Sequence, residues 1–193
     1  MPETAAWRVM ISLAERSDSV VLLGAQPDYP EVEYGWIELG SPLGREGSQL
    51  FRVREFREKP VIEVARRLFE QGSLWNTFVM VGRVDAFLKI IESAAPDWYD
   101  ALSEVTSLSS GDSKQEVRAA ARWYADLAPA DFSNRAVSAN IERFAVLRLG
   151  DTGWSDLGDP DRLLALAPTL ERKPPVRQYL PAHLELARAA ATD

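Results

Sequence analysis

Hydrophobic and polar positions follow two different spacings along the chain, and these predict strands and helices in mixed order. Short, nearly continuous apolar runs predict strands inside a sheet. Longer segments with apolar residues at i, i+3, i+4 and i+7 predict amphipathic helices. The order of these segments predicts an α/β protein with a mixed β-sheet flanked by helices. We expect strands at 20–25, 34–39, 50–56, 74–81 and 144–149, and helices at 3–15, 61–71, 84–93, 97–105 and from 113 onward.

A turn and one amphipathic helix follow the third expected strand. Lys59 stands before Pro60, which biases Lys59 towards an extended conformation, so we expect its ammonium group at the exit of a strand. Gly72 supplies a residue that adopts the left-handed conformation readily and thereby ends the helix. The helix is expected to bury one face, made up of Val61, Val64, Ala65, Leu68 and Phe69.

The strand expected at 74–81 is almost continuously apolar, which predicts that both of its faces are covered. Asn76 is the exception within this run. A carboxamide in a buried strand is either satisfied within the protein or turned towards a ligand. The pattern alone leaves both alternatives open.

Composition narrows the range of functions. The 193 residues include no cysteine and one histidine, His183, which excludes disulfides, thiolate nucleophiles and multi-histidine metal sites. The net charge of -7 argues against a nucleic-acid partner, because such binding depends on clustered Lys and Arg. No apolar run is long enough to cross a bilayer, and the N-terminus has no basic region followed by an apolar segment. We therefore expect a cytoplasmic protein with no membrane partner.

Several sequence blocks occur in an order that is typical of one enzyme family. F-R-E-K-P (56–60) precedes the helix and L-W-N-T-F-V (74–79) follows it. P-D-Y-P-E-V-E-Y-G-W-I-E-L-G (27–40), D-F-S (131–133) and W-S-D-L-G (154–158) complete the series. Together they resemble the sugar-1-phosphate nucleotidyltransferases, and most of all the mannose-1-phosphate guanylyltransferases. The resemblance covers nearly the whole chain and implies the C-terminal part of a nucleotide-diphospho-sugar transferase fold, which is Rossmann-like.

The resemblance implies a sugar-phosphate site. It implies that Lys59 meets the sugar phosphate and that Asn76 binds the sugar. Tyr34 and Gly35 match the step where the backbone approaches the sugar, a place where glycine has a steric reason. From the residues alone, the alternative for Lys59 is a solvated lysine at a turn.

Two carboxylates are also candidates. Glu58 is expected to accept hydrogen bonds from sugar hydroxyls, and its alternative is an ion pair with Arg57 or Arg54. Asp156 matches the family aspartate that helps to hold Mg²⁺, and its alternative is a helix-entry cap. A single aspartate is compatible with Mg²⁺, which often takes one or two protein carboxylates and completes its shell with water and substrate phosphates.

The family reaction is attack of a sugar phosphate on the α-phosphorus of a nucleotide, with magnesium, releasing pyrophosphate and forming a nucleotide sugar. Such a reaction depends on positioning and charge neutralisation and needs no nucleophilic side chain. The resemblance implies mannose 1-phosphate and GTP as substrates. It makes Lys59 and Asp156 the expected catalytic residues.

The sequence departs from the family pattern in three places. Glu33 stands where the family usually has glycine, and Thr77-Phe78 replaces Ser-Gly after the asparagine. The second change puts bulk where glycine usually floors the sugar pocket, which indicates a different sugar or a pocket no longer used. The family's nucleotide-binding half carries a G-x-G-x-R-x-x-P loop, which cradles the triphosphate, and a second metal-binding aspartate. Neither of these occurs in the sequence.

The missing nucleotide-binding half has consequences for the chain. We expect the strand at 20–25 to lack its usual neighbours and to leave an apolar edge open, so that the chain is a truncated fragment, is completed by a second polypeptide or associates with itself. The enzyme would then be inactive alone. The alternative is a non-catalytic subunit that binds or regulates sugar nucleotides, and a third hypothesis is a structural interaction module. We expect one domain over 1–172 and a tail with one helix over 173–193.

Overall fold

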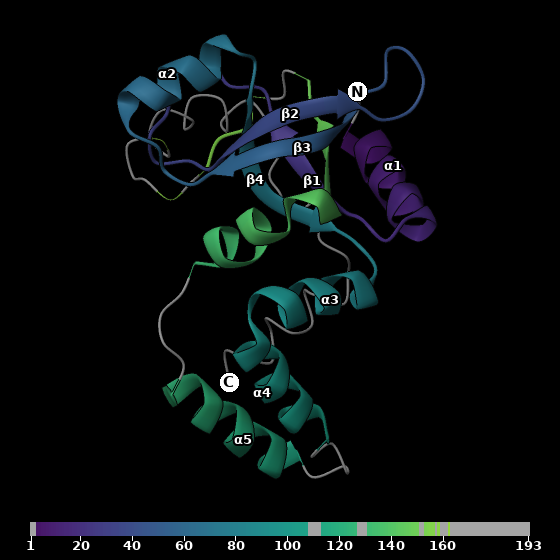
Figure 1. The fold of residues 1–193 in the computed structure, drawn as a ribbon, viewed down its shortest axis with the longest axis vertical. Coiled ribbons are helices and arrows are strands. Elements are labelled where there is room, and N and C mark those ends of the chain that lie inside the picture. Colours follow the sequence, from purple (N-terminus) through teal and green to yellow (C-terminus); the bar gives the residue numbers. More distant parts are fainter. Residues whose placement is uncertain are drawn as a thin grey trace, which may run out of the picture. The chain divides into compact units, whose positions relative to one another are not determined.

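The computed structural model describes residues 3–107, 113–126, 131–150, 153–156, 158 and 162 (Figure 1). The chain divides into two compact units, Met1–Thr152 and Gly153–Asp193. The boundary expected after residue 172 and the expected tail helix lie outside the described residues.

The first unit contains every strand and helix that the hydrophobic pattern predicted up to residue 150, with bounds that differ by a few residues. No helix in the described part of the chain is both long and apolar enough to cross a membrane. In chain order the elements are α1 (Glu3–Arg16), β1 (Val20–Ala25), β2 (Trp36–Pro42), β3 (Leu50–Arg57), α2 (Ile62–Glu70), β4 (Leu74–Val81), α3 (Val84–Ala94), α4 (Pro96–Ser107), α5 (Ser113–Asp126), the π-helical turn η1 (Ser133–Val137), the 3-10 helix η2 (Ser138–Arg143) and β5 (Phe144–Arg148).

The five strands form one mixed sheet that closes on itself in the order β1-β4-β2-β3-β5. All neighbouring pairs are antiparallel except β1 and β5, which run parallel. Helices pack beside this sheet (Figure 1). The prediction of an α/β protein with a mixed sheet and helices is therefore confirmed.

Both edges of β1 are paired, so the expected open edge is wrong. Val21 pairs with Val81 of β4 on one side and with Ala145 of β5 on the other. The second neighbour is β5, which lies near the end of the first unit and takes the place expected for a strand of the missing half. The argument for self-association that rested on an exposed edge therefore does not hold.

The core lies on both faces of β1, because successive side chains of a strand point to opposite sides. Val20 and Leu22 belong to a large buried cluster that also contains residues of α3 and η1. Val21 and Leu23 belong to a second cluster with Met10 of α1. The continuous apolar run of β1 is thus explained by cover on both faces.

β4 is covered less completely than its sequence predicted. Leu74, Trp75 and Thr77 are buried, but the side chain of Phe78 is 61% exposed. Phe78 also has a φ of 59°, which interrupts the regular strand geometry. The prediction of a strand buried on both faces therefore holds for the first half of β4 and is wrong for the second.

α2 buries a narrower stripe than the expected face. Ala65 and Leu68 are buried, whereas Val61 and Phe69 are 65% and 38% exposed. Val61 is the N-cap residue and so stands outside the helical turns. Gly72 follows the helix with a φ of 72°, as predicted for its end.

We predict that Gly24→Ala lowers the free energy of unfolding by about 1–3 kcal/mol, because it overpacks the core. A Cβ at Gly24 would lie 2.6 Å from Leu74 Cδ1 and 3.0 Å from Val146 Cγ2. Gly150→Ala is a matched control, since a Cβ there meets no atom within 4 Å. Urea unfolding of both variants measures the difference, and equal midpoints would contradict this account.

Candidate functional site

Three segments of backbone meet at the entrance to β2. The Lys59 N–H donates to the carbonyl of Tyr34 (3.2 Å), and the Asn76 N–H donates to the carbonyl of Gly35 (2.7 Å). Glu58 precedes Lys59 in the turn that follows β3. The structure thus brings together the five residues expected on the sugar side, namely Tyr34, Gly35, Glu58, Lys59 and Asn76.

Gly35 sits where no side chain fits. A Cβ at this position would lie 2.8 Å from Glu58 Oε2, 2.8 Å from Phe56 Cζ and 3.4 Å from Asn76 Cβ. Any larger residue here would have to displace the carboxylate of Glu58 and the ring of Phe56. Because Gly35 has no side chain, the carboxylate of Glu58 and the side chain of Asn76 can flank the same stretch of backbone.

The arginines near Glu58 bind other carboxylates. Arg54 and Arg57 both pair with Glu38 of β2, at 2.5 and 3.1 Å, and Arg57 also pairs with Glu55 at 2.8 Å. Antiparallel pairing of β2 with β3 places Glu38 opposite Glu55, within reach of both arginines of β3. Among the described residues Glu58 has no hydrogen bond or ion pair, so the expected alternative of a local ion pair does not form.

Burial raises the pKa of the Glu58 carboxyl, and the negative charge of Asp131 raises it further. Lys59 acts in the opposite direction and does not compensate. A half-buried carboxylate that faces another acid and has no donor is a group that a hydrogen-bonding ligand would stabilise.

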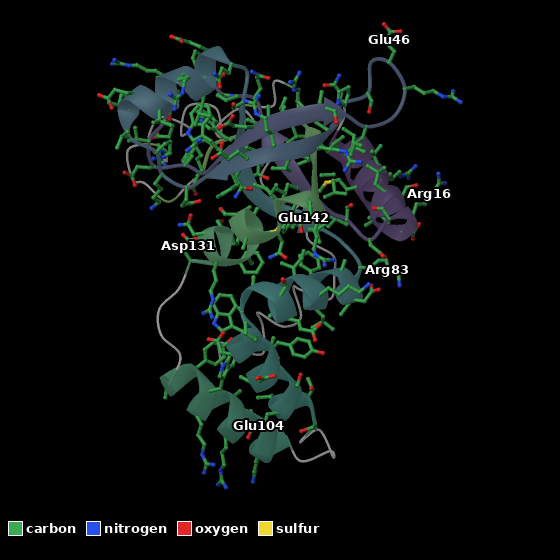
Figure 2. All side chains as sticks on the ribbon, viewed as in Figure 1. Arg16, Glu46, Arg83, Glu104, Asp131 and Glu142 are labelled. Carbon is green, nitrogen blue, oxygen red and sulfur yellow. The ribbon has the colours of Figure 1, made fainter. Side chains whose placement is uncertain are left out.

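Asp131 is a neighbour of the site that the sequence pattern indicates as part of a turn or helix cap, not as a site residue. Its Oδ1 accepts a hydrogen bond from the Asn134 N–H (2.9 Å) in the first turn of η1. Figure 2 shows Asp131 where the chain enters this turn. The sequence signal that could have placed Asp131 near the site was the D-F-S block, because that block recurs in the family.

Lys59 lies at the exit of β3, as predicted, but its backbone is not extended. Its φ is 43°, and Lys59 and Phe78 are the non-glycine residues with positive φ in the described part of the chain. Such conformations cost about 1–3 kcal/mol each and cluster at functional sites. Lys59 Nζ lies 3.7 Å from Glu33 Oε2, and both side chains are more than half exposed. An exposed pair of this kind is weak, so the ammonium group is accessible to a stronger anion.

The side chain of Asn76 is satisfied within the protein in part. Its Oδ1 accepts a hydrogen bond from the Phe78 N–H (3.1 Å) and so fixes the local turn. Its side-chain nitrogen donates to none of the described residues. The oxygen is satisfied within the protein, and the two N–H donors remain for water or a ligand.

Thr77 and Phe78, which replace the family's Ser-Gly, have different surroundings. The buried Thr77 hydroxyl donates to the carbonyl of Leu23 (2.7 Å) and ties β4 to β1. Phe78 projects an exposed ring that meets Phe132 edge to face, with ring centroids 6.4 Å apart. The left-handed backbone at Phe78 gives a physical reason for glycine at this place in the family.

Asp156 belongs to the second unit and is not among the residues that the first unit brings together. Its Oδ1 accepts a hydrogen bond from the Gly158 N–H (3.1 Å), and its Oδ2 lies 3.8 Å from Arg162 Nη1. The helix entry expected at Asp159 and Pro160 lies outside the described residues. In the part of the chain that the structure describes, no three Asp, Glu or His side chains gather as a metal site.

Comparison with known proteins assigns the class. A family model described as nucleotidyl transferase matches residues 4–173. The chain belongs to this family and, within it, to the sugar-1-phosphate nucleotidyltransferases. It is 32% identical over 144 residues to mannose-1-phosphate guanylyltransferase 2 of Escherichia coli O157:H7, and 31% identical over 157 residues to mannose-1-phosphate guanylyltransferase of Sinorhizobium fredii. These matches cover 72% and 77% of the chain but 29% and 28% of the relatives.

Two solved structures share the fold. The crystal structure of mannose-1-phosphate geranyltransferase from Thermus thermophilus has a TM-score of 0.62 and 28% identity, over 75% of this chain and 38% of that one. The crystal structure of mannose-6-phosphate isomerase from Helicobacter pylori has a TM-score of 0.59 over 79% and 57% of the two chains. The second is 22% identical and shows the fold alone.

We predict that Glu58→Gln is more stable than the parent chain at about pH 7. The pKa of Glu58 is higher in the folded than in the unfolded chain, so stability falls as pH rises from the unfolded to the folded pKa. Below both values, near pH 3, the advantage of Glu58→Gln should vanish. Melting temperatures at the two pH values measure this, with Glu104→Gln on α4 as an exposed control. An equal advantage at both pH values would count against a raised pKa.

Proposed function

We propose that this chain supplies the sugar-phosphate side of a nucleotidyltransferase site that takes mannose 1-phosphate and GTP. The observation that carries the proposal is the convergence of the Tyr34-Gly35 backbone, Glu58, Lys59 and Asn76 at the entrance to β2. The relatives in Escherichia coli and Sinorhizobium fredii are mannose-1-phosphate guanylyltransferases, which supports the choice of sugar and base. We also propose that the unit is the C-terminal part of a Rossmann-like transferase fold.

Lys59 provides the cation for the sugar phosphate. Its ammonium group is exposed and has a weak, exposed partner in Glu33. A phosphate dianion carries more charge than a carboxylate and offers more acceptor oxygens, so it would displace Glu33. The backbone bond from Lys59 to Tyr34 fixes the turn that presents the ammonium group.

Glu58 and Asn76 provide complementary partners for the sugar hydroxyls. A carboxylate accepts hydrogen bonds, whereas the carboxamide nitrogen donates them. Gly35 lies between the two side chains and allows a ligand close to the backbone. Donation by a hydroxyl favours the charged form of Glu58, so sugar binding should lower its pKa again.

The chemistry asks for positioning more than for proton transfer. An anionic oxygen of the sugar phosphate attacks the α-phosphorus of the nucleotide, and the bond from that phosphorus to the pyrophosphate oxygen breaks. The attacking oxygen is already deprotonated, so no general base is needed. Lys59 would hold the attacking phosphate in place while Glu58 and Asn76 orient the sugar.

Asp156 has the donor chemistry for Mg²⁺. Its carboxylate is 53% exposed, and Mg²⁺ prefers oxygen ligands with substrate phosphates completing the shell. Arg162, 3.8 Å from Oδ2, would compete for one oxygen. When bound, the ion would supply neutralisation of the nucleotide phosphates.

The nucleotide needs a cradle that the 193 residues do not contain, since the sequence has no G-x-G-x-R-x-x-P segment. We propose that this cradle comes from residues outside the given sequence, in the same polypeptide or in another chain. The same absence favours a second candidate function, a subunit that binds sugar nucleotides without turnover.

We predict that Lys59→Ala weakens mannose 1-phosphate binding by roughly 10- to 100-fold, the range for loss of a charge-assisted hydrogen bond. Titration calorimetry measures the affinity. Lys89→Ala is the matched control, because Lys89 is similarly exposed and its carboxylate partners, Asp18 and Asp85, are outside the site. Unchanged affinity in Lys59→Ala would refute the assigned role.

We predict no pyrophosphate release by the 193-residue chain with magnesium, GTP and mannose 1-phosphate. Addition of a nucleotide-binding segment that carries the Gly-rich loop should restore release if the chain is part of an enzyme. Continued binding without release would favour the binding subunit. Turnover by the chain alone would overturn the need for an external cradle.

A further inference from the structure

Two phenylalanine rings border the polar groups of the site. Phe78 lies two residues after Asn76 and meets Phe132 edge to face, with an interplanar angle of 82°. Phe132 follows Asp131, whose charge acts on Glu58. The Phe78 N–H donates to Asn76 Oδ1 (3.1 Å), so the backbone of Phe78 is tied to the carboxamide, while its ring meets the residue that follows Asp131.

Neither the backbone nor the core explains a phenylalanine at position 78. Its φ of 59° is unfavourable for a bulky side chain, and glycine would adopt it without strain. The side chain is 61% exposed and belongs to neither buried cluster. A strained, exposed aromatic residue beside unpartnered polar groups indicates a ligand contact.

We propose that Phe78 stacks against the sugar ring of the bound sugar 1-phosphate and determines which sugar is accepted. A pyranose presents a face of C–H groups and a rim of hydroxyls. The aromatic ring would cover the apolar face, while Glu58 and Asn76 bind the hydroxyls, a division that is typical of small-molecule sites. Phe132 holds the Phe78 ring through their edge-to-face contact. This inference rests on the proposed function.

Phe78→Gly separates a ligand contact from a structural role. We expect this variant to bind mannose 1-phosphate about tenfold more weakly, because it loses the stacked ring. Its affinity for inorganic phosphate should not change, since Lys59 remains. Its melting temperature should stay equal or rise, because glycine relieves the left-handed strain. A residue with a merely structural role would lower the melting temperature instead.

Two further variants sharpen the test. Phe78→Leu keeps the apolar bulk and the strained backbone without the aromatic ring, and it should also weaken binding. Tyr124→Ala removes a comparably exposed aromatic side chain, 67% exposed on α5, and should leave the affinity unchanged. Titration calorimetry with mannose 1-phosphate and with inorganic phosphate measures all of these.

The outcomes distinguish this inference from the proposed function. If the parent chain binds mannose 1-phosphate and Lys59→Ala weakens binding, but Phe78→Gly binds equally well or more tightly, the ring does not stack on the sugar and the inference is overturned. Tighter binding by Phe78→Gly would show that the ring blocks the pocket. No binding of mannose 1-phosphate by the parent chain would overturn the proposed function and this inference together.

Discussion

The whole site depends on a stretch of backbone at Gly35 that leaves no room for a side chain. Its carbonyl accepts the Asn76 N–H, and the preceding carbonyl, that of Tyr34, accepts the Lys59 N–H. A Cβ at Gly35 would overlap the carboxylate of Glu58. A larger residue would therefore push the Glu58 carboxylate out of its present place, so the arrangement of the cation, the carboxylate and the carboxamide depends on this glycine.

The closed sheet provides the rigidity that this arrangement needs. β1 is paired on both edges. One of its faces is covered by residues of α1, and the other by residues of α3 and η1. Strained backbone at Lys59 and Phe78 persists only where the surroundings hold it in place. The stability gained in the sheet thus offsets the unfavourable conformations in β4 and in the turn after β3, where ligand contacts are proposed.

Local patterns predicted the elements well because they act over short distances. The apolar run of 20–25 and the glycine at position 72 were sufficient for a strand and a helix end. Sheet closure was not predictable, since the pairing of β1 with β5 joins residues that are distant in sequence and no local pattern specifies it. The surroundings of Glu58 were not predictable either, because the arginines that were its alternative partners pair with Glu38 across β2 and β3. Tertiary contacts also override the bias that Pro60 imposes on Lys59.

The charge distribution of the site explains why its polar groups are better suited to a ligand than to one another. Glu58 and Asp131 repel, and the pKa of Glu58 is raised by burial as well as by that charge. The nearby arginines are engaged by Glu38 and cannot relieve this repulsion. In the proposed function, a neutral sugar brings hydroxyl donors without adding charge, and its phosphate would meet Lys59 in the same turn. A sugar 1-phosphate would therefore satisfy both ends of the proposed site at once, which neither a free sugar nor a free phosphate would do.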